Sequence, residues 1–121
     1  MNQSESAKTA IRNCGHQEFL LKLLDAIPIM ITVYDPSINR VELNQEVQRL
    51  TGWTQEDADR EGIMNLVYPD PAYRQQVADF MLALHPGWRD ITMTCRDGHT
   101  FEASWSNIRL TDERQVGIGI D

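Results

Sequence analysis

The sequence has few cysteines, few basic residues and no long run of apolar residues. Its two cysteines, Cys14 and Cys95, form no Cys-x-x-Cys pair. Cys95 falls on the apolar face of a predicted strand, so we interpret it as a buried thiol in a reducing compartment. No apolar run approaches membrane-spanning length, and residues 1–15 lack the basic start and apolar stretch of a signal peptide. These absences predict a cytoplasmic protein without a membrane segment.

Acidic residues outnumber basic ones. The chain has 11 Lys and Arg against 18 Asp and Glu, a net charge of −7, and its basic residues form no cluster. Such a surface would repel a phosphate backbone, so we predict no nucleic-acid binding. With 121 residues, of which 41% are hydrophobic, the chain has the size and composition of one globular domain. We assign residues 1–15 to a disordered leader or linker and residues 16–121 to a single domain.

The strongest structural signal is a hairpin around Asp97-Gly98. Apolar and polar residues alternate on both sides of it, as in half-buried strands. A two-residue loop would set the apolar face of one strand against the polar face of the other. A three-residue loop, Arg96-Asp97-Gly98 with Gly98 left-handed, restores the match, and we predict this loop. It places these residues on one inward face: Ile91, Met93, Cys95, Phe101, Ala103 and Trp105.

Capping and spacing signals predict the other elements. Residues 16–27 carry Phe19, Leu20, Leu23, Leu24 and Ile27 at helical spacing and precede the first strand, so their apolar face must cover the sheet or another subunit. Asn44, the Thr54 to Asp57 capping box and Asp70-Pro71 each begin a helix. Strands are predicted at residues 29–35, 40–43 and 114–121, and helices at 45–50, 54–57, 61–68 and 71–84. This order implies an α+β fold in which short helices cover one face of a five-stranded antiparallel sheet.

The order and the residues together resemble the PAS family of sensory domains. The resemblance covers about residues 20 to 121, and its pieces are Leu24-Asp25-Ala26-Ile27-Pro28, Val33-Tyr34-Asp35, Leu43-Asn44, Leu50-Thr51-Gly52-Trp53, Tyr68-Pro69-Asp70, Arg96-Asp97-Gly98 and Gly117-Ile118-Gly119-Ile120-Asp121. PAS domains are input or relay modules attached to histidine kinases, diguanylate cyclases or transcription regulators. The resemblance implies that an output domain, normally reached through a coiled-coil linker, is missing from this sequence.

In that family, ligands lie in a cavity between the sheet and the helices. The residues that the resemblance and the strand alternation place there are Thr32, Tyr34, Asn44, Met81, Met93, Trp105 and Gly119. Each has a structural alternative: Asn44 can serve only as a helix cap, and core packing can fill the cavity. Gly117 and Gly119 alternate on the last strand and leave a strip without side chains, where a ligand ring or the bulk of Trp105 could lie.

Specific cofactors and catalysis have less support in the sequence. Flavin-binding relatives carry an Asn-Cys-Arg motif on the central helices, which this chain lacks, and haem-binding relatives carry a histidine in the longer helix, where only His85 stands at the end. His16, His85 and His99 lack metal-ligand spacing, so no metal site is predicted. Glu56, Asp57, Asp59 and Glu61 are interpreted as a solvated face, and no nucleophile or phosphate-binding motif occurs, so no catalytic residue is assigned.

We therefore expect a cytoplasmic sensor or relay domain of the histidine kinase or diguanylate cyclase type, forming a homodimer through residues 16–27. The cofactor and the signal are left unassigned. The leading alternative is a ligand-free dimerisation and relay domain whose cavity is filled by Met81, Met93 and Trp105. A more distant alternative, a small α+β enzyme, would need two titratable groups that face each other inside the cavity.

Overall fold

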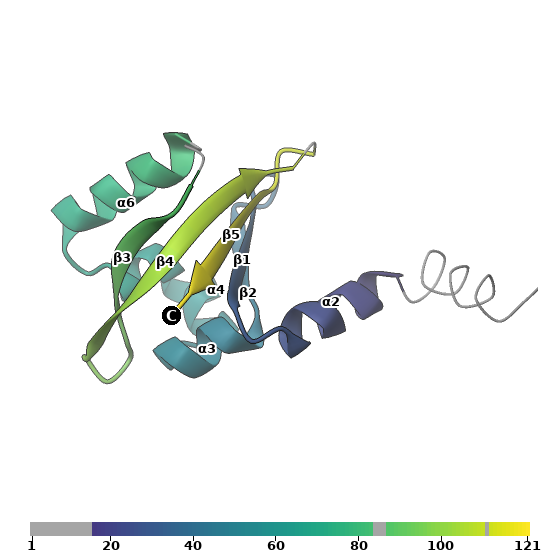
Figure 1. Cartoon of the computed structure of the whole chain (residues 1–121), viewed down its shortest axis with the longest axis horizontal. Helices are drawn as coiled ribbons and strands as arrows, with labels where there is room; N and C mark the ends of the chain where they lie inside the picture. Colours follow the sequence, from purple (N-terminus) through teal and green to yellow (C-terminus); the bar gives the residue numbers. More distant parts are fainter. Residues whose placement is uncertain (1–15, 84–86, 111) are drawn as a thin grey trace, which may run out of the picture.

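The computed structural model describes residues 16–83, 87–110 and 112–121 (Figure 1). The predicted leader at residues 1–15, together with Cys14, His85 and Leu84, lies outside these ranges. The elements run in the order helix, two strands, four helices and three strands, with the bounds α2 (His16–Ala26), β1 (Met30–Asp35), β2 (Arg40–Leu43), α3 (Gln45–Thr51), α4 (Gln55–Glu61), α5 (Ile63–Val67), α6 (Pro71–Ala83), β3 (Arg89–Thr94), β4 (Thr100–Arg109) and β5 (Gln115–Ile120).

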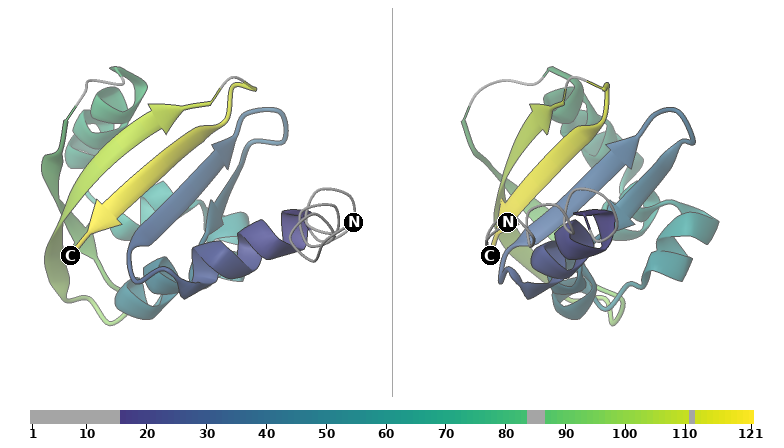
Figure 2. Two further views of the ribbon diagram at one scale, coloured as in Figure 1. Left: turned by 45° about the vertical axis from the view of Figure 1, so that its right-hand side comes forward. Right: turned by 90° about the vertical axis from the view of Figure 1, so that its right-hand side faces the viewer.

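The five strands form one antiparallel sheet in the order β2-β1-β5-β4-β3. The last strand of the chain, β5, lies in the middle of the sheet between β1 and β4 (Figure 2). Helices α3 to α6 lie on one face of the sheet and share one apolar core with it. The predicted α+β architecture is therefore confirmed.

The β3–β4 hairpin has the predicted register. Ile91 pairs with Ala103 and Met93 with Phe101, and the Cys95 N–H donates to the His99 carbonyl oxygen over 2.8 Å. This leaves Arg96, Asp97 and Gly98 as the loop, with Gly98 at φ 95°. Side-chain alternation then turns Met93 and Trp105 inward, where they are 3% and 6% exposed.

Local capping fixes where the covering helices begin. The Asn44 side chain accepts a hydrogen bond from Val47 N at the start of α3, and α3 ends at Gly52 with φ 79°. Thr54 and Asp57 form the predicted capping box of α4. Helix α6 begins at Pro71, as predicted, where proline's missing N–H costs least.

The hairpin is anchored on the helices through its loop. Arg96 donates its backbone N–H to the Thr51 carbonyl oxygen over 2.8 Å, and its Nη1 lies 2.7 Å from Asp57 Oδ2. The Trp53 indole N–H donates to the Thr94 carbonyl oxygen over 3.1 Å. These contacts join the end of α3 and the start of α4 to the far end of the hairpin.

The structure corrects one expectation for the acidic stretch of α4. Glu56, Asp59 and Glu61 are exposed as predicted, but Asp57 is only 5% exposed. A hydrogen bond from the backbone N–H of Thr54, with the charges of Arg96 and Arg60 beside it, holds the pKa of Asp57 below its usual value. Asp57 is thus a buried structural carboxylate, because it serves both the helix cap and the hairpin anchor.

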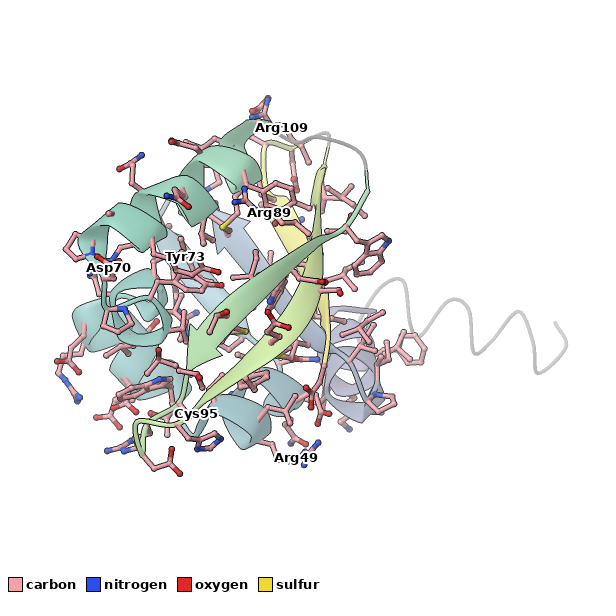
Figure 3. The ribbon with its side chains drawn as sticks, turned by 60° about the vertical axis from the view of Figure 1, so that its left-hand side comes forward. Arg49, Asp70, Tyr73, Arg89, Cys95 and Arg109 are labelled. Atoms are coloured by element: carbon pink, nitrogen blue, oxygen red, sulfur yellow. The ribbon has the colours of Figure 1, made fainter. Side chains whose placement is uncertain are left out.

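Helix α6 covers the β3 edge of the sheet. The Thr92 backbone N–H donates to the Tyr73 hydroxyl oxygen over 2.8 Å. Arg89 extends over the ring of Phe80, with 5.4 Å between its Cζ and the ring centroid. Figure 3 shows Tyr73 on α6 and Arg89 on β3. Helix α6 thereby supplies an acceptor for one backbone N–H on the unpaired edge of β3.

Helix α2 extends away from the body of the domain (Figure 1). Near its C-terminal end, Asp25 Oδ1 accepts a hydrogen bond from Gln45 N over 3.1 Å. Farther out, Phe19 and Leu23 are 45% and 44% exposed. None of the helices in the described ranges is long and apolar enough to cross a membrane.

Candidate functional site

A cleft of about 760 Å³ lies between the inner face of the sheet and helices α4, α5 and α6. Its volume is within the range of small-molecule sites. Its apolar part is built from buried side chains of the core, among them Ile63, Val67, Val77, Ile91 and Met93. At its rim, Ile38 and Leu82 are well exposed. The cleft is therefore an apolar chamber that opens to solvent.

Trp105 forms one wall of this cleft. Its Nε1 lies 3.3 Å from the sulfur of Met93, so the two inward side chains hold each other in place. The indole lies against the backbone of Gly119, since a Cβ at that position would come within 2.6 to 2.9 Å of three ring atoms. The sequence predicted that either a ligand ring or Trp105 would lie against the two glycines of the last strand. At Gly119 this space is filled by Trp105. Gly117, by contrast, lines the cleft.

A row of polar groups crosses the sheet at Gly117. Thr32 on β1 and Asn107 on β4 both pair with Gly117 on β5, so their side chains flank it on the inner face. A Cβ at Gly117 would lie 2.6 Å from Thr32 Oγ1 and 3.2 Å from Asn107 Oδ1. Asn107 Nδ2 is buried and has no hydrogen-bond partner among the described residues. This donor belongs to a residue that lines the cleft.

An ion pair stands at the mouth of the cleft. Arg40 Nε and Nη2 donate to the two carboxylate oxygens of Asp59 over 3.1 and 3.2 Å, and Arg40 Nη1 lies 3.3 Å from Glu42. The hydrogen bond with Asp59 raises the pKa of Arg40, and the same bond lowers the pKa of Asp59. Beside them, the Tyr34 hydroxyl donates to Asn39 Oδ1 over 3.1 Å.

Solved structures share the fold that surrounds this cleft. No family model and no curated protein matches the sequence. A domain of a sensory box sensor histidine kinase/response regulator from Geobacter sulfurreducens superposes with a TM-score of 0.69 at 16% identity, covering 88% of this chain and 94% of that one. The PAS domain of an HTR-like protein from Haloarcula marismortui superposes with a TM-score of 0.63 at 21% identity, covering 95% of this chain and 98% of that one. The chain has the PAS fold. The LOV domain of a blue-light activated histidine kinase from Erythrobacter litoralis superposes with a TM-score of 0.61 at 19% identity, covering 78% of this chain and 96% of that one.

Five of the seven predicted ligand-binding residues line the cleft of this PAS fold: Thr32, Tyr34, Met81, Met93 and Trp105. The structure places the other two, Asn44 and Gly119, outside the lining. Asn44 Oδ1 accepts hydrogen bonds from Ile31 N and Val47 N, and its Nδ2 donates to the Ile29 carbonyl oxygen. It therefore joins the start of β1 to the start of α3. Gly119 lies beneath Trp105.

Asn107 and the Arg40–Asp59 pair at the cleft were not predicted from the sequence. The inward orientation of Asn107 could have been predicted, because Asn107 follows the inward-facing Trp105 by two residues on the same strand. Arg40 and Asp59 are 19 positions apart and belong to a strand and a helix, so no local pattern brings them together.

The lining residues that the structure describes include neither histidine nor cysteine. The cleft of this PAS fold thus presents, from those residues, no imidazole for haem iron and no thiol for covalent flavin chemistry. His85, the histidine nearest to the position of a haem ligand in the sequence, falls outside the described ranges.

One group of possible metal ligands lies at the hairpin loop, away from the cleft. The ligand atoms of Cys95, Asp97 and His99 lie within 4.8 Å of one another. Local structure accounts for all three: Asp97 accepts from His99 N over 3.0 Å and contacts His99 Nδ1, and Cys95 Sγ donates to the Leu50 carbonyl oxygen over 3.4 Å. Burial raises the pKa of the Cys95 thiol, which opposes formation of the thiolate that a metal requires.

Proposed function

We propose that this domain is the sensory input module of a signalling protein and binds a small molecule in the cleft between its sheet and its helices. The observation that carries the proposal is the cleft itself, which combines an apolar wall with a few convergent polar groups. Two of the similar structures belong to histidine kinases that their names describe as a sensor and as light-activated. An output domain of the histidine kinase or diguanylate cyclase type, and a cytoplasmic location, form part of the proposal.

The proposed signal passes through the strands that border the cleft. Thr32 and Tyr34 lie on β1, which follows α2 directly, and Gly117 lies on β5, which runs to the end of the chain. A ligand that fits one packing of sheet and helices better than another shifts the population toward it. That shift would change how α2 and the end of β5 leave the domain.

We also propose that α2 forms a homodimer contact. Its apolar residues Phe19 and Leu23 are about half exposed. The neighbouring Glu18 and Lys22 side chains are solvent exposed as well, so the apolar strip formed by Phe19 and Leu23 is only partly covered within the described part of the chain. A second α2 would bury this strip and give the sensor its dimeric signalling unit.

A ligand-free relay domain is the second candidate. The contact between Trp105 Nε1 and the Met93 sulfur favours it, because these two side chains already pack against each other inside the fold. In that case the cleft would close by movement of Met81 and its neighbours on α6, and signals would pass between flanking domains without a ligand. The two candidates differ in whether a small molecule fills the cleft.

Native mass spectrometry of the protein purified from its natural source tests the proposal. The sensor predicts a bound small molecule, together with a dimer mass. Met81→Trp, which fills the cleft, should remove that molecule, whereas Ile108→Trp should leave it bound, because Ile108 is exposed on the opposite face of β4. A wild-type protein without any bound molecule would instead favour the relay.

A further inference from the structure

We infer that the cleft selects an uncharged, mostly apolar molecule that offers a hydrogen-bond acceptor, such as a ketone or amide carbonyl, to Asn107 Nδ2. The inference rests on the proposed ligand-binding function and specifies its chemistry. Asn107 is the single buried side-chain donor without a partner in the ranges that the structure describes. Asn107 also lines the cleft, so a small turn of its buried amide would present Nδ2 to a bound molecule.

An unsatisfied buried donor must be compensated. A buried amide N–H that loses its partner is costly, which is why almost all such groups in native proteins are hydrogen bonded. The strand register holds Asn107 in this position, because Asn107 pairs with Gly117 and follows Trp105 by two residues. A carbonyl oxygen from a ligand would supply the missing acceptor, with the apolar wall around Met93 receiving the rest of the molecule.

Thr32 and Asn107 form a small polar spot on the inner face of the sheet, and Gly117 between them keeps this spot compact. A side chain there would collide with Thr32 Oγ1 at 2.6 Å and press on Asn107 Oδ1 at 3.2 Å, so glycine allows Thr32 and Asn107 to approach each other across β5. This small polar spot, on a surface that is mostly apolar, fits one small polar group on a mostly apolar ligand.

The charges at the cleft exclude an anion. Arg40 is the one cationic side chain among the described lining residues, and it already pairs with Asp59 and lies beside Glu42. A carboxylate entering the cleft would lose its hydration without gaining a free counter-charge. The acceptor is therefore expected on a neutral group.

Three matched probes test this inference by isothermal titration: 2-acetylnaphthalene, 2-ethylnaphthalene and 2-naphthoate. They share an aromatic body and differ in having a neutral acceptor, no acceptor or a charged one. The wild type should bind the acetyl compound about tenfold more tightly than either of the others, as one buried hydrogen bond implies. Asn107→Val should abolish the preference over the ethyl compound, and Ser106→Val, on the outward face of the same strand, should keep it.

The protein without ligand gives a second readout. Asn107→Val removes the unsatisfied donor, so it should raise the thermal midpoint of the empty domain more than Ser106→Val does. A lower midpoint for Asn107→Val, tightest binding of naphthoate, or a preference that survives Asn107→Val would each overturn the inference. If all three probes bind equally well, only the inference fails; if none binds the wild type, the proposed ligand-binding function fails with it.

Discussion

The indole of Trp105 lies against the backbone of Gly119, on the neighbouring strand of the sheet. The two residues are paired in the register of β4 and β5, and a Cβ on Gly119 would lie 2.6 Å from Cε2 of the ring. The glycine thus determines how deeply the indole can sit. Because Trp105 also forms a wall of the cleft, this contact sets the width of the candidate site.

Gly119→Ala should destabilise the domain by about 2 kcal/mol, because the added methyl group overpacks a rigid buried ring. Urea unfolding followed by circular dichroism measures the loss. Gly117→Ala is the comparison and should cost less, since the one atom closer than 3 Å to its Cβ is the Thr32 hydroxyl, which rotation about χ1 can move aside, whereas a buried indole cannot turn away. Equal losses for the two variants would show that the indole is free to move.

Asn44→Ala should cost about 2 to 3 kcal/mol of stability. The substitution removes the cap of α3 and leaves the Ile31 N–H without its side-chain acceptor. Asn44→Asp keeps both acceptor functions and loses the donor to the Ile29 carbonyl oxygen, so it should fall between the wild type and the alanine variant. Chemical denaturation ranks the three proteins. An alanine variant as stable as the wild type would contradict a bridging role for Asn44.

Asp57 should make the domain less stable in acid. Its pKa is lowered in the folded state, so its stabilising contribution is present above about pH 4 and is lost as the pH falls through the folded pKa. Asp57→Asn should therefore lower the thermal midpoint at pH 7, and the gap to the wild type should narrow in more acidic buffer. Glu56→Gln, an exposed neighbour on α4, is the control and should change the midpoint much less. A gap that stays constant from pH 7 to pH 3 would refute this assignment.

Leu23→Glu should convert a dimer into a monomer, because it places a charge in the exposed apolar strip of α2. Light scattering during size-exclusion chromatography measures the mass. Lys22→Glu introduces the same charge next to it, at a side chain that is already 78% exposed, and should leave the mass unchanged. If the Leu23→Glu protein keeps the wild-type mass, α2 is not the dimer contact.

Local sequence signals were sufficient for most of the fold. The hairpin register followed from alternation around Asp97-Gly98, because a shift by one residue would expose the whole apolar face of a strand. Helix boundaries followed from side chains that cap their own helix, such as Thr54 and Asp57. These interactions span three or four residues and are visible in the sequence itself.

Interactions between distant segments were not predictable in the same way. From the sequence, Asp57 was predicted to be solvent exposed. Its burial could not be predicted locally, because it depends on Arg96, 39 positions later in the chain. The Arg40–Asp59 pair at the cleft mouth likewise appears only once β2 and α4 are placed side by side. Asn107 was within reach of the period-two pattern, but the lack of a partner for its Nδ2 depends on what the rest of the fold brings near it.

The attachment of α2 at its C-terminal end gives small displacements a large effect. The helix has 11 residues, which corresponds to a length of roughly 16 Å. A tilt of about 10° at Ala26 would therefore carry its far end through roughly 3 Å, more than half the rise of one helical turn. In the proposed dimer, helix α2 would act as a lever that converts a small adjustment beside Thr32 into a larger displacement at the contact with the second subunit.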